Sequence, residues 1–173
     1  KELRKAIKDI PDFPMKGIMF RDLTPILADQ KVFKATIEEL KKLTSKYEFD
    51  YIVAPESRGF WFGLPLASAT DKAFIPCRKK GKLPRKCIEE TYALEYGTAT
   101  LEITEGDIKP GSKVLIVDDL LATGGTMKAI VNLVRKAKAE VVATAFVVNL
   151  SYLPGEKIIK EECKVPCEYL INL

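Results

Sequence analysis

Residues 114–126 read Val-Leu-Ile-Val-Asp-Asp-Leu-Leu-Ala-Thr-Gly-Gly-Thr. The apolar run at the start predicts a buried strand over Lys113 to Val117, because short apolar runs of this length are typical of strands covered on both faces. The strand ends in two adjacent carboxylates, Asp118 and Asp119. Side by side, these two groups can accept hydrogen bonds from sugar hydroxyls and help to organise Mg²⁺.

A loop of small and hydroxyl residues follows the two acids and opens a helix that we predict over residues 124–138. Backbone N–H groups at such a helix N-terminus converge on an anion, and Thr123 and Thr126 add hydroxyl donors. The loop lacks the Gly-Lys-Ser/Thr of a Walker motif and the Gly-x-Gly-x-x-Gly of a dinucleotide site. It therefore predicts a phosphate site of another kind.

Buried strands and amphipathic helices alternate on both sides of this segment. We expect helices over 31–47, 62–69 (with Pro65 in its first turn) and 156–163, and strands over 50–54, 73–76, 140–150 and 169–173. This order predicts a mainly parallel sheet covered by helices on both faces. Ligands of such sheets bind beyond the carboxyl ends of the strands, which points to residues 55–59, 78 onward and 118–126.

Residues 78–106 carry several glycines, many charges and weak alternation, and we expect a long excursion with hairpin character that acts as a lid. Its first part, residues 78–86, holds six cations and no anion, whereas the rest of the chain has 22 basic and 24 acidic residues. Such a segment suits a nucleic acid, an acidic partner or a phosphate-rich small molecule. Few aromatic residues are interleaved with the cations, which disfavours nucleic acid.

Composition narrows the function classes further. The 173 residues fit one domain, and no apolar run is long enough to span a membrane. The charged N-terminus shows no secretory signal, and the four cysteines lack a Cys-x-x-Cys pair, so we expect free thiols and a cytoplasmic protein. With no histidine, Ser-His-Asp and Cys-His catalysis and His-containing zinc sites are excluded.

The segment 114–126 resembles the phosphoribosyl-pyrophosphate (PRPP) signature of the type I phosphoribosyltransferases. This resemblance implies an α/β fold with a mainly parallel central sheet flanked by helices. A small N-terminal hood (about 1–30) and a long flexible lid hairpin (about 78–106) would complete a single domain over 1–173. It also implies that Asp118 and Asp119 bind the ribose hydroxyls. The 5-phosphate would be held by the loop residues Ala122, Thr123, Gly124, Gly125 and Thr126.

Four other segments resemble adenine phosphoribosyltransferases, in the correct order: 13–25, 56–60, 78–84 and 92–97. The first implies that Met19, Phe20 and Arg21 bind adenine, with the Phe20 ring stacked on the purine. The second implies a pyrophosphate loop of Ser57, Arg58 and Gly59, often with a non-proline cis peptide, in which Arg58 is also catalytic. In this chain Ala54-Pro55 precedes the loop where glycine is common, so its conformation stays open.

The remaining two segments supply the lid. The resemblance implies that Arg78, Lys79 and Lys82 bind pyrophosphate, reaching the neighbouring subunit's site in a homodimer. It also implies that Glu95 assists proton transfer at the purine. The expected reaction converts adenine and PRPP to AMP and pyrophosphate through an oxocarbenium-like transition state. Mg²⁺ would be held mainly by PRPP, with Asp118 and Asp119 touching it at most through water.

Two alternatives remain open. The first is a transferase for another base, such as hypoxanthine, guanine, xanthine or orotate, which the segment around Phe20 disfavours. The second is a regulator of transcription that binds PRPP or nucleotides on the same fold without converting them. The chain shows no helix-turn-helix extension, and its excess positive charge lies in the expected lid, so we favour the enzyme.

Overall fold

The structure is a computed structural model and describes residues 2–94 and 96–173. The chain divides into two compact units, one up to Glu39 and one from Leu40 onward. Within the described residues, none of the helices combines the length and the apolar character needed to cross a bilayer.

The N-terminal unit contains a small antiparallel pair of strands in which Ile10 lies opposite Phe20. The last helix of this unit begins where Asp29 Oδ1 accepts the N–H groups of Lys31 and Val32 at 3.0 and 3.2 Å, which satisfies two donors that the first turn leaves without partners. The elements are α1 (Glu2–Ala6), β1 (Lys8–Ile10), β2 (Phe20–Asp22), α2 (Thr24–Ala28) and α3 (Gln30–Thr44), the last of which continues into the second unit.

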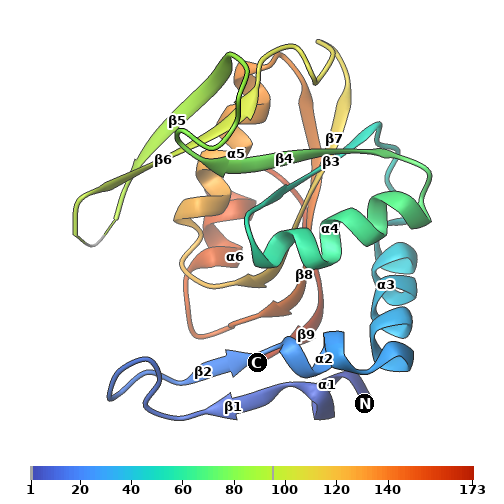
Figure 1. The fold of residues 1–173 in the computed structure, drawn as a ribbon, viewed down its shortest axis with the longest axis vertical. Coiled ribbons are helices and arrows are strands. Elements are labelled where there is room, and N and C mark those ends of the chain that lie inside the picture. Colours follow the sequence, from blue (N-terminus) through green and yellow to red (C-terminus); the bar gives the residue numbers. More distant parts are fainter. Residues whose placement is uncertain (1, 95) are drawn as a thin grey trace. The chain divides into compact units, whose positions relative to one another are not determined.

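The second unit is built on a seven-stranded sheet with the order β5-β6-β4-β3-β7-β8-β9 (Figure 1). Strands β4, β3, β7, β8 and β9 run parallel, and β6 and β5 join one edge in antiparallel pairing. The strands are β3 (Tyr51–Pro55), β4 (Ala73–Lys79), β5 (Cys87–Ala93), β6 (Thr98–Thr104), β7 (Lys113–Leu121), β8 (Glu140–Asn149) and β9 (Cys167–Asn172). The predicted mainly parallel sheet is confirmed.

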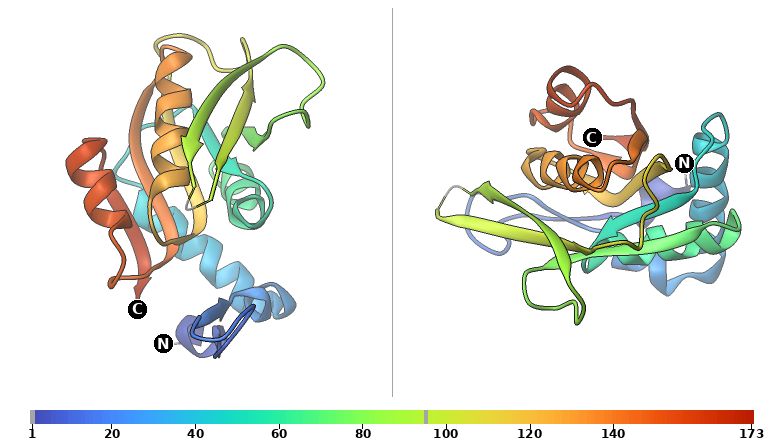
Figure 2. Two further views of the ribbon diagram at one scale, coloured as in Figure 1. Left: turned by 90° about the vertical axis from the view of Figure 1, so that its left-hand side faces the viewer. Right: turned by 90° about the horizontal axis from the view of Figure 1, so that it is seen from above.

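Helices cover both faces of this sheet. Helix α4 (Arg58–Ala69) connects β3 to β4, and α5 (Gly125–Lys136) connects β7 to β8 on the opposite face (Figure 2). The two connections leave in opposite directions from the centre of the strand order, and right-handed crossovers then place their helices on opposite faces. A short helix α6 (Gly155–Lys157) followed by a π-helical turn (Ile158–Glu162) precedes β9.

The opposite connections create a switch point between β3 and β7, where ligands of open α/β sheets bind. The pairing of β7 with β3 ends at Ile116, opposite Val53, whereas its pairing with β8 continues to Leu121. Strand β3 ends at Pro55, which has no N–H to extend the ladder. One side of β7 is therefore open from residue 117 onward, and both acids lie on this open stretch.

Three predicted boundaries near the open end of the sheet are wrong, and the helix predicted over 31–47 ends at Thr44. Strand β7 does not stop before the acids but carries Asp118 and Asp119, because β8 continues to pair with it. Strand β4 runs to Lys79, since β6 pairs with it at Arg78 and Lys79. Residues 98–104 thus belong to the main sheet, and Leu101 and Ile103 are buried in its core.

The third wrong boundary is the start of α4. The helix begins at Arg58 rather than Phe62, which puts Pro65 in its interior instead of its first turn. An interior proline removes one helical hydrogen bond. The helix persists because Phe62 and Leu66 are fully buried and Gly63 lies so close to β3 that an added Cβ would be 2.7 Å from the Ala54 Cβ.

Candidate active site

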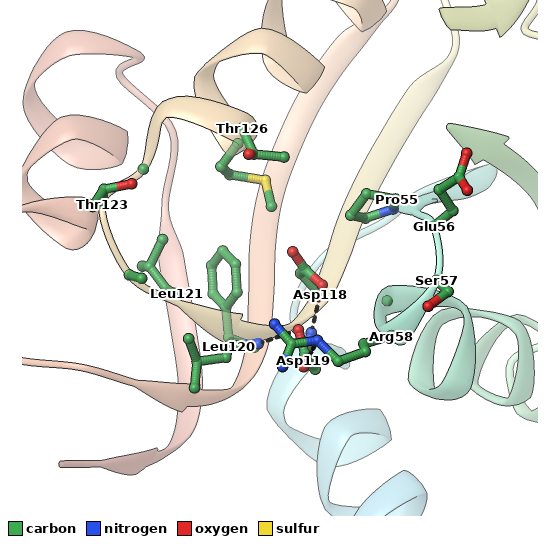
Figure 3. A pocket seen from close by; sticks show the side chains of 15 residues that line it. Pro55, Glu56, Ser57, Arg58, Asp118, Asp119, Leu120, Leu121, Thr123 and Thr126 are labelled. Carbon is green, nitrogen blue, oxygen red and sulfur yellow. Dashed lines mark hydrogen bonds and ion pairs between the residues drawn. The ribbon is translucent and has the colours of Figure 1, made fainter. Parts of the chain in front are cut away.

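A cavity of about 370 Å³ opens at the carboxyl ends of β3 and β7 (Figure 3). Two segments form most of its lining, residues 55–59 at the end of β3 and residues 118–124, 126 and 127 around the end of β7, and Phe146 of β8 completes it. The structure therefore brings together the pyrophosphate loop and the PRPP signature that the sequence predicted. The predicted residues that line the cavity are Ser57, Arg58, Gly59, Asp118, Asp119, Ala122, Thr123, Gly124 and Thr126; Gly125 lies between the last two and begins α5.

The two acids at the foot of the cavity are held by the backbone that follows each of them. Asp118 Oδ1 accepts the N–H of Asp119 at 2.8 Å, and Asp119 Oδ1 accepts the N–H of Leu120 at 2.8 Å. Burial, and then the neighbouring Asp119 charge, raise the pKa of Asp118 well above its usual range. Keeping both Asp118 and Asp119 ionised therefore costs free energy, and hydrogen-bond donors on a ligand would offset this cost.

Arg58 covers the second acid. Its Nε lies 3.2 Å from Asp119 Oδ2, and the Asp119 side chain is only 3% exposed whereas the Arg58 side chain is 44% exposed. Among the described residues no well-directed hydrogen bond reaches this buried Oδ2. The oxygen is neutralised by the guanidinium but retains its capacity to accept a hydrogen bond.

The loop above the acids is shaped for close approach of an anion. Gly124 has φ +91°, a left-handed conformation that favours glycine, and it caps α5 without any side-chain hydrogen bond. The first N–H groups of α5 therefore have no side-chain cap, and residues at this end of the helix, Gly124, Thr126 and Met127, line the cavity. Thr126, in the first turn, lines the cavity.

The C-terminal segment supports this loop, a role that the sequence did not predict. Gly155 N–H donates to the Ala122 carbonyl at 3.0 Å. An added Cβ at Gly155 would lie 2.5 Å from that carbonyl oxygen, and one at Gly124 would lie 3.0 Å from the Gly155 Cα. The two glycines allow the start of α6 to pack directly against the backbone of residues 122–124 and fix the position of this loop.

The basic segment lies next to the cavity through Glu56, which lines it. Glu56 Oε1 accepts the N–H of Lys79 at 2.8 Å and Arg78 Nε at 3.3 Å, and Oε2 accepts Lys82 Nζ at 3.3 Å. Burial opposes ionisation of Glu56, but these three contacts outweigh it and lower its pKa. The three predicted pyrophosphate ligands Arg78, Lys79 and Lys82 do not line the cavity themselves but converge on one of its walls.

The expected cis peptide is present, between Glu56 and Ser57, so Ala54-Pro55 does not prevent the loop conformation implied by the resemblance. The expected adenine residues belong to the N-terminal unit. Met19 is 43% exposed, the Phe20 ring lies edge-on to Phe13 at 5.1 Å between centroids, and Arg21 pairs with Asp9 at 2.7 Å. Glu95 lies outside the described residues.

Several lining residues were not predicted as site residues. Pro55, Leu120, Leu121, Met127 and Phe146 supply the apolar part of the cavity. Leu120 and Leu121 lie within the quoted signature, so their position next to the acids was a usable signal. No sequence signal indicates that Phe146 belongs to the site, because only the pairing of β7 with β8, in which Phe146 lies opposite Asp118, brings it to the cavity.

A model of the phosphoribosyl transferase domain family matches residues 23–165, and the chain belongs to this family. Relatives of the chain show to which group within this family it belongs. An adenine phosphoribosyltransferase of Thermotoga petrophila is 52% identical over 159 residues, which cover 92% of this chain and 94% of the relative. At this identity and coverage the chain is a member of the adenine phosphoribosyltransferases.

Solved structures agree with this assignment. The crystal structure of adenine phosphoribosyltransferase from Thermoanaerobacter pseudethanolicus matches with a TM-score of 0.95 at 45% identity, over 99% of this chain and 98% of that one. The enzyme from Saccharomyces cerevisiae, solved with an imino-altritol bisphosphate and adenine, matches with a TM-score of 0.87 at 38% identity, over 98% and 96% of the two chains.

Proposed function

We propose that the protein transfers the phosphoribosyl group of PRPP to adenine, giving AMP and pyrophosphate. One observation carries this proposal: a single cavity joins an acid pair, an arginine loop and an uncapped helix N-terminus. These are the three kinds of group that a sugar bearing a phosphate at one end and a pyrophosphate at the other requires. The names of the relatives supply the base, adenine.

The 5-phosphate is proposed to bind at residues 122–126, where the first N–H groups of α5 and the two threonine hydroxyls donate to it. The ribose hydroxyls then donate to Asp118 and Asp119. The buried Asp119 Oδ2, which has a counter-ion but no directed hydrogen bond within the described residues, supports this placement. Neutral hydroxyl donors satisfy the acid pair without adding charge to the foot of the cavity.

Arg58 exchanges partners in this proposal. It pairs with Asp119 before PRPP binds, and the pyrophosphate, with more negative charge and more acceptor oxygens, draws the exposed guanidinium away. This movement uncovers Asp119 for the ribose at the same time as it places a cation on the leaving group. Ser57 and Gly59 of the same loop complete the pyrophosphate site.

The bond between ribose C1 and the pyrophosphate oxygen then breaks, its electron pair leaves with pyrophosphate, and an adenine nitrogen forms the new bond to C1. The transition state is oxocarbenium-like, so catalysis rests on alignment and on neutralising the leaving group. Met19, Phe20 and Arg21 are proposed to hold adenine, and Glu95 to accept the proton released from it. Arg78, Lys79 and Lys82 are proposed to add positive charge, in the partner's site if the homodimer forms.

We propose that Mg²⁺ enters this site with the substrate, bound mainly to the phosphates of PRPP. Among the described residues no three Asp, Glu, Cys or His side chains form a metal-binding group. Bound there, Mg²⁺ would neutralise phosphate charge, and Asp118 and Asp119 are the residues that would hold it, through its waters.

A homodimer and a cytoplasmic location remain parts of the proposal. Cys77, Cys163 and Cys167 are buried free thiols, the state typical of a reducing compartment.

The experiment is a base panel. Purified protein, Mg²⁺ and PRPP are incubated separately with adenine, hypoxanthine, guanine, xanthine and orotate, and nucleotide formation is measured. We expect AMP from adenine and no product above background from the other bases. A nucleotide from another base in preference to AMP would assign a different transferase. PRPP binding without any product would favour the regulator.

A further inference from the structure

The hairpin strand β5 rests on helix α5 along one face. Its residues Ile88, Glu90 and Tyr92 alternate with exposed neighbours and are half-buried. Glu90 accepts Asn132 Nδ2 at 2.9 Å and pairs with Lys136 Nζ at 2.6 Å. The hairpin is therefore attached to the same helix whose first turn forms the phosphate loop.

The last of these contacts reaches the loop itself. The Tyr92 hydroxyl lies 3.1 Å from Thr126 Oγ1, and either oxygen can be the donor. The Tyr92 ring also lies beside Gly125, since a Cβ added there would be 3.9 Å from its Cδ2, an ordinary van der Waals distance. Tyr92 thus contacts Thr126 and lies beside Gly125, two consecutive residues of the proposed phosphate site, and it does not itself line the cavity.

A phosphate in the loop would fix the direction of this hydrogen bond. An ionised phosphate oxygen only accepts hydrogen bonds, so Thr126 must use its one hydroxyl hydrogen to donate to it. The Thr126 oxygen must then accept the hydrogen bond that the Tyr92 hydroxyl donates. The result is a chain from tyrosine to threonine to phosphate, in which each bond strengthens the next. Without Tyr92, the Thr126 hydroxyl loses its bond to the hairpin, and its orientation has to be fixed when the ligand binds.

We propose that Tyr92 is a positioning residue for the 5-phosphate: its hydroxyl orients Thr126 and couples phosphate binding to the β5–β6 hairpin. This inference rests on the proposed function, because it takes residues 122–126 as the phosphate site. It predicts that Tyr92 acts through Thr126 and has no effect of its own on the adenine side of the reaction.

The test compares variants that differ by one hydroxyl. Tyr92→Phe removes the oxygen that reaches Thr126. Thr91→Val is the matched control, because its hydroxyl makes an equivalent bond to Thr100 at 2.7 Å on the exposed face of the same hairpin. Thr126→Val and the double variant Tyr92→Phe/Thr126→Val complete a cycle. Calorimetry measures the Kd of ribose 5-phosphate for each protein, and steady-state rates give KM for PRPP and kcat.

We expect Tyr92→Phe to raise the Kd of ribose 5-phosphate and the KM for PRPP by about threefold to tenfold, the range for one lost hydrogen bond. Its kcat at saturating PRPP should change less, and Thr91→Val should match the wild type. In the Thr126→Val background the tyrosine substitution should have no further effect. This non-additivity shows that Tyr92 acts through Thr126. An unchanged unfolding temperature in Tyr92→Phe separates this positioning role from a general loss of stability.

Two results would overturn the inference about Tyr92 but not the phosphate site. The first is an unchanged Kd of ribose 5-phosphate in Tyr92→Phe while Thr126→Val binds it weakly. The second is a Tyr92→Phe effect on Kd that keeps its full size in the Thr126→Val background. A different result overturns the phosphate-site assignment beneath it. If the wild type and Thr126→Val bind ribose 5-phosphate equally, or neither binds it, the assignment of the phosphate to residues 122–126 falls and the inference falls with it, whereas the base panel still decides the reaction.

Discussion

Asp118→Asn is expected to make the protein more stable and much less active. Burial and the adjacent Asp119 raise the pKa of Asp118, so its ionised form opposes folding. Asparagine removes this charge and keeps an Oδ1 that can accept the N–H of Asp119. Since 1 kcal/mol shifts Tm by roughly 2–4 °C in a domain of this size, we expect Tm to rise by a few degrees near neutral pH.

The same substitution removes a charged acceptor for a ribose hydroxyl. Hydrogen bonds to charged groups contribute about 1.5–3 kcal/mol, so kcat/KM for PRPP should fall by about tenfold to a hundredfold. Asp118→Asn/Asp119→Asn should lose more, with a higher KM and a lower turnover. Unchanged kinetics in the double variant would contradict the ribose assignment.

The stability gain should depend on pH in a defined direction. Because the pKa of Asp118 is raised in the folded state, the carboxyl costs nothing at a pH below its unfolded value, where it is protonated in both states. The cost grows as pH rises from the unfolded pKa to the folded pKa and is constant above it. The Tm difference between Asp118→Asn and wild type should therefore be small near pH 4 and increase toward neutral pH.

Thermal unfolding between pH 4 and 8 measures this difference. Asp71→Asn is the matched control, an exposed aspartate after α4 with φ +57°, a conformation that asparagine tolerates. It should show neither effect. A Tm of Asp118→Asn below the wild-type value at neutral pH would contradict the assigned cost of the acid pair.

Arg58→Gln is expected to produce the largest loss of activity. In the proposed mechanism this guanidinium neutralises the departing pyrophosphate, and loss of one such fixed donor lowers kcat by about a hundredfold to a thousandfold. Arg58→Lys should restore part of the rate only, because an ammonium cannot make the paired hydrogen bonds of a guanidinium. Steady-state rates of AMP formation at saturating adenine measure both.

Measurements of the free energy of unfolding separate the two roles of Arg58, as the counter-ion of Asp119 and as a ligand of the departing pyrophosphate. Arg58→Gln leaves the buried Asp119 without its cation, which should cost about 1–2 kcal/mol after allowance for the exposure of Arg58. Adding Asp119→Asn should recover that stability and leave the activity low. Arg85→Gln, which breaks an exposed ion pair with Asp107, is the control and should keep the wild-type rate. A rate near wild type in Arg58→Gln would remove Arg58 from catalysis.

The sheet and the identity of its central loops were predictable because both depend on local patterns. Apolar runs of strand length and the PRPP signature are contiguous in sequence. Boundaries were less predictable because they depend on partners. β7 extends through its acids because β8 pairs with it there, and α4 contains Pro65 because burial of Phe62 and Leu66 outweighs one missing hydrogen bond.

Contacts between segments that are distant in sequence were not predicted, because they too depend on which elements pack together. Gly155 supports the loop of residues 122–124 although it lies 33 positions beyond Ala122 in the sequence, and nothing local to Pro154-Gly155 indicates more than a turn. Glu56 and Tyr92 lie in quoted motifs, but their bonds to the basic segment and to Thr126 follow from strand pairing and from the packing of β5 on α5.

The most direct measurement is a crystal structure of the protein with ribose 5-phosphate. We expect the phosphate within hydrogen-bond distance of the N–H groups and hydroxyls of residues 123–126, and the sugar hydroxyls on the carboxylates of Asp118 and Asp119. A phosphate bound elsewhere, or a sugar that leaves both acids untouched, would contradict the assignment of this cavity as the PRPP site.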